Sequence, residues 1–207
     1  MKKFELTTNT KIWFGRKLFQ IKALISFGNV KEGELGGYIE KEANLYHSGD
    51  AWVYGDAKVY GNARVCGNAK VCGNAWVCGD AEVYGDAKVY GDAKVCEDAW
   101  VCEDAWVYGN AKVYGNAEVC GNAWVCGNAE VYGDADYATI KGFGTEFRAT
   151  TFFKCKDGAT RVRCGCFYGD LNEFREQVKN TRTGKIAEEY LMIADLMEKH
   201  FKEEKDV

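Results

Sequence analysis

The chain has 207 residues, 47% of them hydrophobic and 28% charged, which is typical of a folded soluble protein. Its formal net charge is −4 and no basic stripe is available to neutralise phosphates, which argues against a nucleic-acid partner. No apolar run is long enough to span a membrane, and residues 1–8 lack the apolar core of a signal peptide. We therefore expect a cytoplasmic protein with no membrane partner.

Residues 1–37 are expected to form a β-rich N-terminal cap. Ile12 and Phe14 lie two residues apart, as on one face of a strand, Gly15 suits a turn, and the apolar segment 18–25 is able to pair back. Residues 30–37 are expected to form a loop. Because an open coil end exposes unpaired backbone groups, this cap is expected to cover the first turn of the repeat that follows.

The middle of the chain, residues 38–140, is organised by the unit Gly-(Asp/Asn)-Ala-x-Val-(Tyr/Cys), repeated without a gap from Gly49 to Asp136. A period of six residues fits a coil with a corner in every unit, in which three units make one triangular turn. Ala and Val are two residues apart, so both face inward, whereas position x and the Tyr/Cys position face outward. Gly followed by Asp or Asn forms the corner, since these residues accept a positive φ.

The repeat predicts about five to six turns of coil. Ile39 and Leu45 precede the fourteen valines and Tyr137 follows them, which gives seventeen inward corners beginning near residue 38. The interval after Leu45 is eight residues instead of six, so two extra residues are expected to form a bulge around His47.

The segments V-Y-G-N-A-K and V-C-G-N-A-W resemble the hexapeptide repeat of left-handed β-helix proteins. The flanks LGGYIEKEANL and FFKCKDGATRVRCGCF are similar to those of bacterial and prophage hexapeptide proteins, some of which carry an acetyltransferase label. This resemblance covers the middle half of the chain and implies a left-handed coil and a homotrimer. Tyr or Cys after the valine departs from the small or acidic residue usual in the family. Because the family includes acyltransferases, sugar-nucleotide enzymes and non-catalytic members, its fold does not decide the function.

Residues 141–207 predict a β-hairpin followed by two helices. Two apolar segments flank Asp157-Gly158, which is a strong hairpin signal. A capping box at Asp170 begins one helix, and a break at Gly184 precedes a second. We expect this unit to cap the coil or to mediate oligomerisation, with its charged end, residues 202–206, frayed. The expected fold class is thus mainly β: a left-handed parallel β-helix between an N-terminal β cap and a C-terminal hairpin with two helices.

Seven of the ten cysteines occupy the repeat position that tyrosine fills in other units. Residues in the same place on successive turns stack about 4.8 Å apart, within reach of a disulfide. Only Cys78 over Cys96 and Cys102 over Cys120 pair two cysteines. Because a designed ladder would pair more of them, we expect reduced cysteines that serve packing, as in cytosolic proteins generally.

Acyl transfer is the catalytic alternative that the resemblance implies. Hexapeptide acyltransferases use a histidine as base beside an acyl-CoA cleft, which a long loop from the coil helps to form. The chain has two histidines and no such loop; His47 is the candidate catalytic base, and His200 is expected to be structural or exposed. A γ-type carbonic anhydrase site needs three histidine ligands and is excluded. Cys155, Cys164 and Cys166 are able to meet across the hairpin, but a fourth ligand is missing, so no metal site is expected. No cofactor other than acyl-CoA, under this alternative, is expected.

Glutamate replaces the corner glycine twice within the repeat, in the run C-E-D-A-W-V-C-E-D-A-W. Four carboxylates are thereby placed at two neighbouring corners, close to Trp106. The residues of this candidate site are Glu97, Asp98, Trp100, Glu103 and Asp104. Two interpretations stay open: drift at a dispensable glycine, or an acidic and aromatic site for a cationic ligand or partner.

Position x of every third unit falls on one side of the coil, where residues 52, 70, 88, 106 and 124 stack as Trp, Lys, Lys, Trp and Trp. The candidate binding residues of this side are Trp52, Tyr54, Tyr90, Trp106, Tyr108 and Trp124. Exposed aromatic patches are typical of interfaces and of stacking platforms, although these rings are also able to stack on one another alone. The first hypothesis is therefore a non-catalytic scaffold that binds a protein, a small ligand or its own copies through this side.

Overall fold

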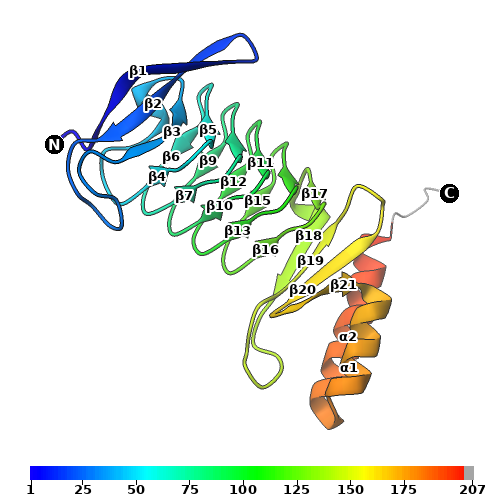
Figure 1. The fold of residues 1–207 in the computed structure, drawn as a ribbon. Coiled ribbons are helices and arrows are strands. Elements are labelled where there is room, and N and C mark those ends of the chain that lie inside the picture. The colour runs from blue at the N-terminus through cyan, green and yellow to red at the C-terminus, as the bar shows by residue number, and fades with distance from the viewer. Residues whose placement is uncertain (203–207) are drawn as a thin grey trace.

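The structure, a computed structural model, describes residues 1–202 and is built around a parallel β-coil with three sides (Figure 1). Two-residue strands recur in every repeat unit, and strands three units apart stack in parallel register. Five of them stack on one side, so the coil makes about five turns. The prediction of a mainly β, parallel solenoid with a cap at each end is confirmed.

The coil strands coincide with position x and the valine of each unit. Their bounds are β4 (Trp52–Val53), β5 (Lys58–Val59), β6 (Arg64–Val65), β7 (Lys70–Val71), β8 (Trp76–Val77), β9 (Glu82–Val83), β10 (Lys88–Val89), β11 (Lys94–Val95), β12 (Trp100–Val101), β13 (Trp106–Val107), β14 (Lys112–Val113), β15 (Glu118–Val119), β16 (Trp124–Val125) and β17 (Glu130–Val131). One side contains β4, β7, β10, β13 and β16, the second contains β6, β9, β12 and β15, and the third continues from β3 (Leu35–Ile39) through β5, β8, β11, β14 and β17.

The coil interior is filled by the alanines and valines of the repeat units from Ala51 to Val131, all of which have no exposed surface. Backbone hydrogen bonds join each turn to the next: the Lys88 N–H donates to the Ala105 carbonyl at 2.9 Å, and the Tyr90 N–H donates to the Val107 carbonyl at 3.0 Å. At the corner before β10, Gly85 has a φ of +71°, a conformation that glycine adopts without steric cost. The predicted inward positions are therefore confirmed from Ala51 to Val131. The outward positions are confirmed except where Trp52, Lys58, Cys96, Cys102 and Cys126 are buried.

The N-terminal cap is a hairpin that extends one side of the coil. Strand β1 (Phe4–Trp13) pairs with β2 (Arg16–Ala23), β2 pairs with β3, and β3 then pairs in parallel with β5. A short 3-10 helix, η1 (Glu42–Asn44), precedes the bulge at His47. The predicted hairpin is confirmed, but residues 35–37 were wrongly expected to lie in a loop, because they begin the strand that joins the hairpin to the coil.

Trp52 is an exception to the outward orientation of position x. Its side chain is fully buried, with ring centroids 5.4 Å from Phe27 and 6.3 Å from Phe4. The expectation that Trp52 forms part of an exposed face is wrong, because the loop after β2 folds over the first turn and covers this ring. Trp52 instead links the N-terminal cap to the coil.

The C-terminal unit is larger than the predicted hairpin. Its four antiparallel strands are β18 (Tyr137–Ile140), β19 (Thr150–Lys154), β20 (Thr160–Cys164) and β21 (Phe167–Asp170). Tyr137, counted from the sequence as a last inward corner, begins β18, because η2 (Asp134–Asp136) turns the chain out of the coil. Phe153 of β19 joins the coil's own core cluster and closes its C-terminal end.

Two helices follow the sheet, α1 (Leu171–Thr181) and α2 (Gly184–Phe201), as predicted. The Asp170 carboxylate accepts hydrogen bonds from the Asn172 and Glu173 N–H groups at 2.8 and 2.9 Å, and the Glu173 carboxylate accepts from the Asp170 N–H at 2.8 Å. This reciprocal pattern is the predicted capping box. The helices and the sheet enclose a second hydrophobic core around Phe152, Phe174 and Tyr190.

Two disulfide bonds join cysteines on successive turns. Cys78 is bonded to Cys96, and Cys102 to Cys120, with Cα–Cα distances of 4.5 and 4.7 Å. The predicted stacking of these pairs is confirmed, whereas the expectation that all cysteines are reduced is wrong for these four. Turn-to-turn spacing places their Cα atoms within the usual range for a disulfide, so bonding needs no backbone movement.

Neither helix within residues 1–202 combines the length and the apolar sequence needed to cross a bilayer. Residues 203–206 of the end expected to fray lie outside the described residues. The division into units 1–37, 38–140 and 141–207 stays a prediction.

Two tryptophans at position x provide a matched test of the cap. Trp52→Ala should lower the free energy of unfolding by about 3 to 5 kcal/mol, because it opens a cavity between cap and coil. Trp100→Ala should change it by less than about 1 kcal/mol, since that ring is 44% exposed. Urea denaturation followed by circular dichroism measures both, and equal losses in the two variants would contradict the buried position of Trp52.

Candidate functional site

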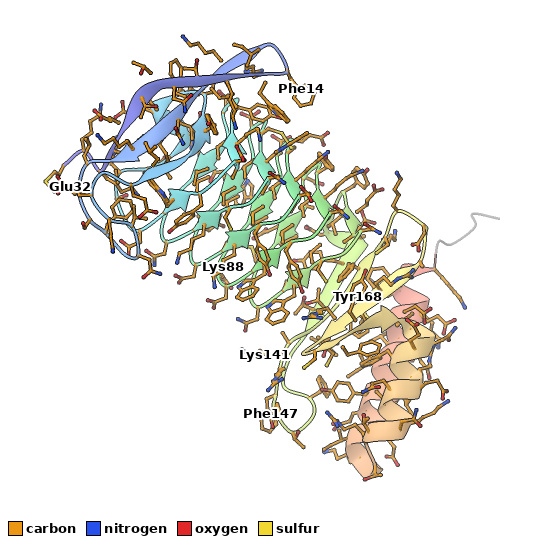
Figure 2. The ribbon with its side chains drawn as sticks, in the orientation of Figure 1. Phe14, Glu32, Lys88, Lys141, Phe147 and Tyr168 are labelled. Atoms are coloured by element: carbon orange, nitrogen blue, oxygen red, sulfur yellow. A yellow bond between two sulfur atoms is a disulfide. The ribbon has the colours of Figure 1, made fainter. Side chains whose placement is uncertain are left out.

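The side of the coil made by β4, β7, β10, β13 and β16 is here called the Trp/Lys face. Its register stacks Trp52, Lys70, Lys88, Trp106 and Trp124 in one column, as the 18-residue period predicts. Beyond the buried Trp52, these side chains stand on the outside of the coil, as labelled Lys88 shows (Figure 2). The column is therefore an ordered outer surface whose spacing is fixed by the backbone ladder.

The ring faces of this column are already in contact with other side chains. Trp106 and Trp124 stack with centroids 5.0 Å apart and planes 10° apart. Lys88 Nζ lies 4.2 Å from the Trp106 centroid, and the Arg163 guanidinium lies 5.4 Å from that of Trp124. Because a cation covers each end of the ring pair, the column presents mainly ring edges outward. A flat stacking platform for a sugar or base is therefore not what this face offers.

A second aromatic column borders the first. Tyr90 and Tyr108 stack with centroids 4.9 Å apart and planes 1° apart, and Tyr54 is half-buried against the core cluster. Burial raises the pKa of the Tyr90 hydroxyl. Burial, with a hydrogen bond to Cys126, also raises the pKa of Tyr108. Both hydroxyls are therefore protonated at neutral pH and remain hydrogen-bond donors.

A groove of about 730 Å³ runs along the Trp/Lys face between the outer column and a corner of the coil. The corner carries the Asp or Asn of each unit, which stack as Asp50, Asn68, Asp86, Asp104 and Asn122. We call this set the corner column. Gly28 and Asn29 of the N-terminal cap also line the groove. The groove is thus polar on one flank and cationic and aromatic on the other.

Asparagine amides hold the corner carboxylates in place. Asn68 Nδ2 donates to Asp86 Oδ1 at 3.1 Å, and Asn122 Nδ2 donates to Asp104 Oδ2 at 3.4 Å. The sequence indicated only a turn-forming role for Asp and Asn. The corner residues are 18 positions apart, so the acidic column could have been predicted from the sequence. Arg163 belongs to the distant strand β20, and no repeat spacing predicts its place beside Trp124.

The candidate acidic and aromatic residues are spread over two sides of the coil. Trp100 belongs to β12 on the second side of the coil, whereas Trp106 belongs to β13 on the Trp/Lys face. Glu97 precedes β12 and Glu103 precedes β13, so the two glutamates lie at different corners on either side of Trp100. The two neighbouring corners expected from the sequence are present, on different sides of the coil because each six-residue unit turns the chain, and binding of a cationic ligand or partner there stays a prediction.

The two corner glutamates adopt the backbone conformation of the glycines that they replace. Their φ angles are +64° at Glu97 and +55° at Glu103. The Glu97 carboxylate accepts a hydrogen bond at 2.7 Å from the N–H of Gly115, the glycine stacked on it in the next turn. Asp98 is exposed beside it. The Glu97 side chain therefore links two successive turns at the same corner of the coil.

His47 lies at the bulge as predicted, but both of its ring nitrogens are engaged. Nδ1 accepts from the Lys3 N–H at 3.2 Å, and Nε2 lies 2.7 Å from Glu42 Oε1, while the ring stacks on Phe4 at 4.4 Å. The accepting Nδ1 assigns the proton to Nε2, which donates to Glu42. His47 therefore ties the N-terminus to the first turn, and neither nitrogen is free to take a proton from a substrate.

The three cysteines of the hairpin, which the sequence did not favour as metal ligands, do not come together as a group of ligand atoms. Cys155, Cys164 and Cys166 form no cluster of ligand atoms in residues 1–202. Burial raises the pKa of the Cys155 thiol to about 11, which disfavours the thiolate that a metal ion needs. The ligand-atom cluster found there contains Cys102, Glu118 and Cys120, but its two sulfur atoms are bonded to each other.

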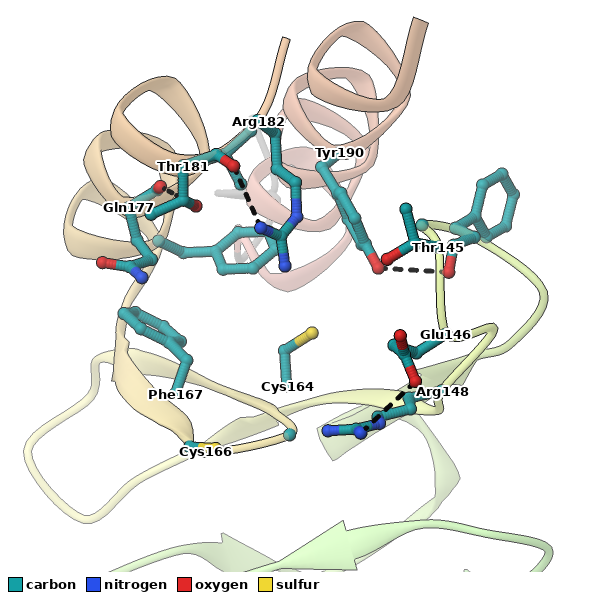
Figure 3. A pocket seen from close by; sticks show the side chains of 15 residues that line it. Thr145, Glu146, Arg148, Cys164, Cys166, Phe167, Gln177, Thr181, Arg182 and Tyr190 are labelled. Atoms are coloured by element: carbon teal, nitrogen blue, oxygen red, sulfur yellow. Dashed lines mark hydrogen bonds and ion pairs between the residues drawn. The ribbon is translucent and has the colours of Figure 1, made fainter.

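A smaller pocket lies in the C-terminal unit, where the sequence predicted no site (Figure 3). It is enclosed by the loop before β19, the turn between β20 and β21, and the two helices. Its two cationic groups, Arg148 and Arg182, come from segments far apart in the chain, so no motif could bring them together. No model of a known protein family matches this chain, and no curated protein matches it either.

The corner glutamates generate a stability prediction. Glu97→Gly should change the free energy of unfolding by less than about 1 kcal/mol, because relief of the positive φ offsets loss of one hydrogen bond. Glu97→Val should lower it by about 1 to 3 kcal/mol, since a β-branched residue is strained at that φ and cannot accept the Gly115 N–H. Urea denaturation measures both; a glycine variant weaker than the valine variant would contradict the structural role.

Proposed function

We propose that the protein is a non-catalytic β-helical scaffold that associates with copies of itself through the Trp/Lys face. The observation on which the proposal rests is the set of charges that line this face. Its corner column contributes Asp50, Asp86 and Asp104, and its other flank contributes Lys70, Lys88 and Arg163. Three acidic and three basic side chains leave the face with no net charge.

These charges have no ion-pair partner of opposite sign within residues 1–202 of their own chain. Within the described residues, none of the six forms an ion pair within 4.0 Å, although other stacked pairs on the coil do, such as Lys112 with Glu130 at 2.7 Å. Asp86 and Asp104 receive only the asparagine amides described above. Two parallel columns of opposite, unpaired charge are therefore available to a partner surface of complementary charge.

A second copy supplies that surface. When copies run in the same direction about an axis parallel to the coil, the corner column of one copy lies against the outer column of the next. Their turns have the same spacing, so each charge meets its counterpart turn by turn. Asp86 and Lys88 lie on the same turn. In this arrangement Asp86 of one copy therefore faces Lys88 of the next copy.

The aromatic edges add apolar area to the same contact. Trp106 and Trp124 are half-buried in the single chain and held rigid by stacking, so a partner orders few additional side-chain rotamers on binding them. Rigid tryptophans beside charged groups are typical of the residues that dominate binding energy at interfaces. This supports association rather than a purely internal role for the column.

Membership of the left-handed hexapeptide family is part of this proposal. The six-residue unit, the inward Ala and Val, and the three-sided parallel coil support it. The homotrimer and the prophage origin implied by the resemblance belong to the same proposal, as does a cytoplasmic location. The engaged nitrogens of His47 give the acyltransferase alternative no comparable support.

Charge reversal on one turn tests the proposal. We expect the wild-type protein to sediment as an oligomer, and Lys88→Glu or Asp86→Lys to weaken association at least about tenfold, because each places like charges across the interface. Combining Lys88→Asp with Asp86→Lys should restore association, since opposite charges again face each other. Analytical ultracentrifugation over a concentration series measures these constants.

Lys94→Glu is the matched control for this experiment. Lys94 Nζ lies 4.2 Å from the Trp76 centroid, the same contact that Lys88 makes with Trp106, but on another side of the coil. This variant should associate as the wild type does. A monomeric wild type, or an oligomer indifferent to reversal at residues 86 and 88, would contradict the proposal.

A further inference from the structure

The pocket in the C-terminal unit is separate from the Trp/Lys face and has a volume of 210 Å³. One wall is apolar and is built by Phe167, Phe174 and Val178, which belong to β21 and α1. The other walls contain polar groups from the loop before β19 and from the link between the helices. The pocket therefore combines an apolar surface with a polar rim, which is typical of small-ligand sites.

Two guanidinium groups lie at this rim. Figure 3 shows Arg182 extending from the link between α1 and α2 toward the space above Cys164, with Arg148 on the opposite side. Arg182 donates to the Thr181 carbonyl at 3.0 Å and forms no ion pair in residues 1–202. Arg148 pairs with Glu146 at 3.5 Å, and both side chains are largely exposed. The rim thus carries two positive charges and one negative charge, so its net charge favours an anion.

The remaining polar groups around the space are neutral and already oriented. The Tyr190 hydroxyl donates to the Phe143 carbonyl at 3.2 Å, and the Cys164 sulfur accepts from the Thr150 hydroxyl at 3.1 Å. Burial raises the pKa of Tyr190, so this hydroxyl is uncharged at neutral pH. Of the five N–H donors of Arg182, one bonds the Thr181 carbonyl and the others remain for a ligand.

The size of the pocket limits the ligand to about one ring. An apolar cavity of about 150 Å³ holds benzene in another protein, so 210 Å³ accommodates one six-membered ring with a small substituent. A planar carboxylate matches the fork of a guanidinium group in two parallel hydrogen bonds. We infer that this pocket binds a small monocyclic carboxylate, with its ring against Phe167, Phe174 and Val178 and its carboxylate on Arg182 and Arg148.

Calorimetric titration of the full chain with benzoate tests the inference. Benzoate should bind saturably, and benzamide, which has the same shape without the charge, should bind at least about tenfold more weakly because charge-assisted hydrogen bonds are lost. Inorganic phosphate should also bind more weakly than benzoate, since it has no ring to place on the apolar wall. No benzoate binding, or equal binding of benzamide or phosphate, would overturn the assignment.

Arginine variants locate the site of binding. Arg182→Gln should weaken benzoate binding at least about tenfold, and Arg148→Gln should weaken it in the same direction. Arg64→Gln is the matched control, because Arg64 lies on β6 of the coil and pairs with Glu82 at 3.3 Å. Circular dichroism melting curves confirm that each variant is folded. Binding that is unchanged in Arg182→Gln, or equally reduced in Arg64→Gln, would overturn the inference.

Discussion

The structure depends on one constraint: each turn must place its alanines and valines directly over those of the next turn. Small and branched side chains fill a narrow three-sided interior, and burial of each valine contributes about 1.5 to 3 kcal/mol. The same stacking aligns the backbone, so that N–H groups of one turn meet carbonyl groups of the next. Corner residues must accept a positive φ, which glycine does freely and Glu97 and Glu103 do at a cost.

This constraint also decides what the outside of the molecule looks like. Any residue type that recurs every third unit becomes a column, so the coil carries columns of cysteine, tyrosine, tryptophan, lysine and aspartate with a common spacing. Some columns are paired within the chain, through the bond between Cys78 and Cys96, the ion pair of Lys112 with Glu130, or the hydrogen bond from the Asn74 amide to Asp92. The Trp/Lys face differs because its charges of opposite sign lie on separate flanks and form no ion pair within the described residues. The association of copies proposed above would pair them.

Periodicity in the sequence was sufficient to predict the coil, its inward positions and the stacked cysteine pairs. Local signals, Asp157-Gly158 and the capping box at Asp170, predicted the C-terminal hairpin and the first helix. Prediction failed where distant segments meet. Trp52 occupies a repeat position that faces outward elsewhere, yet the loop around Phe27 covers it. The strand pairing of Tyr137 with Phe153 could not be seen either, because Tyr137 keeps the repeat spacing. The acidic corner column was readable from the 18-residue step, whereas the pocket around Arg182 depends on loop and helix placement that no local pattern encodes.

All of these columns depend on the register of successive turns. Scalar couplings across hydrogen bonds, measured by NMR on deuterated protein, detect each N–H···O=C pair directly. We expect couplings from the Lys88 amide to the Ala105 carbonyl and from the Tyr90 amide to the Val107 carbonyl, whose N···O distances are 2.9 and 3.0 Å. Couplings that connect these amides to carbonyls one repeat unit nearer or farther along the chain would contradict the three-sided coil and the faces built on it.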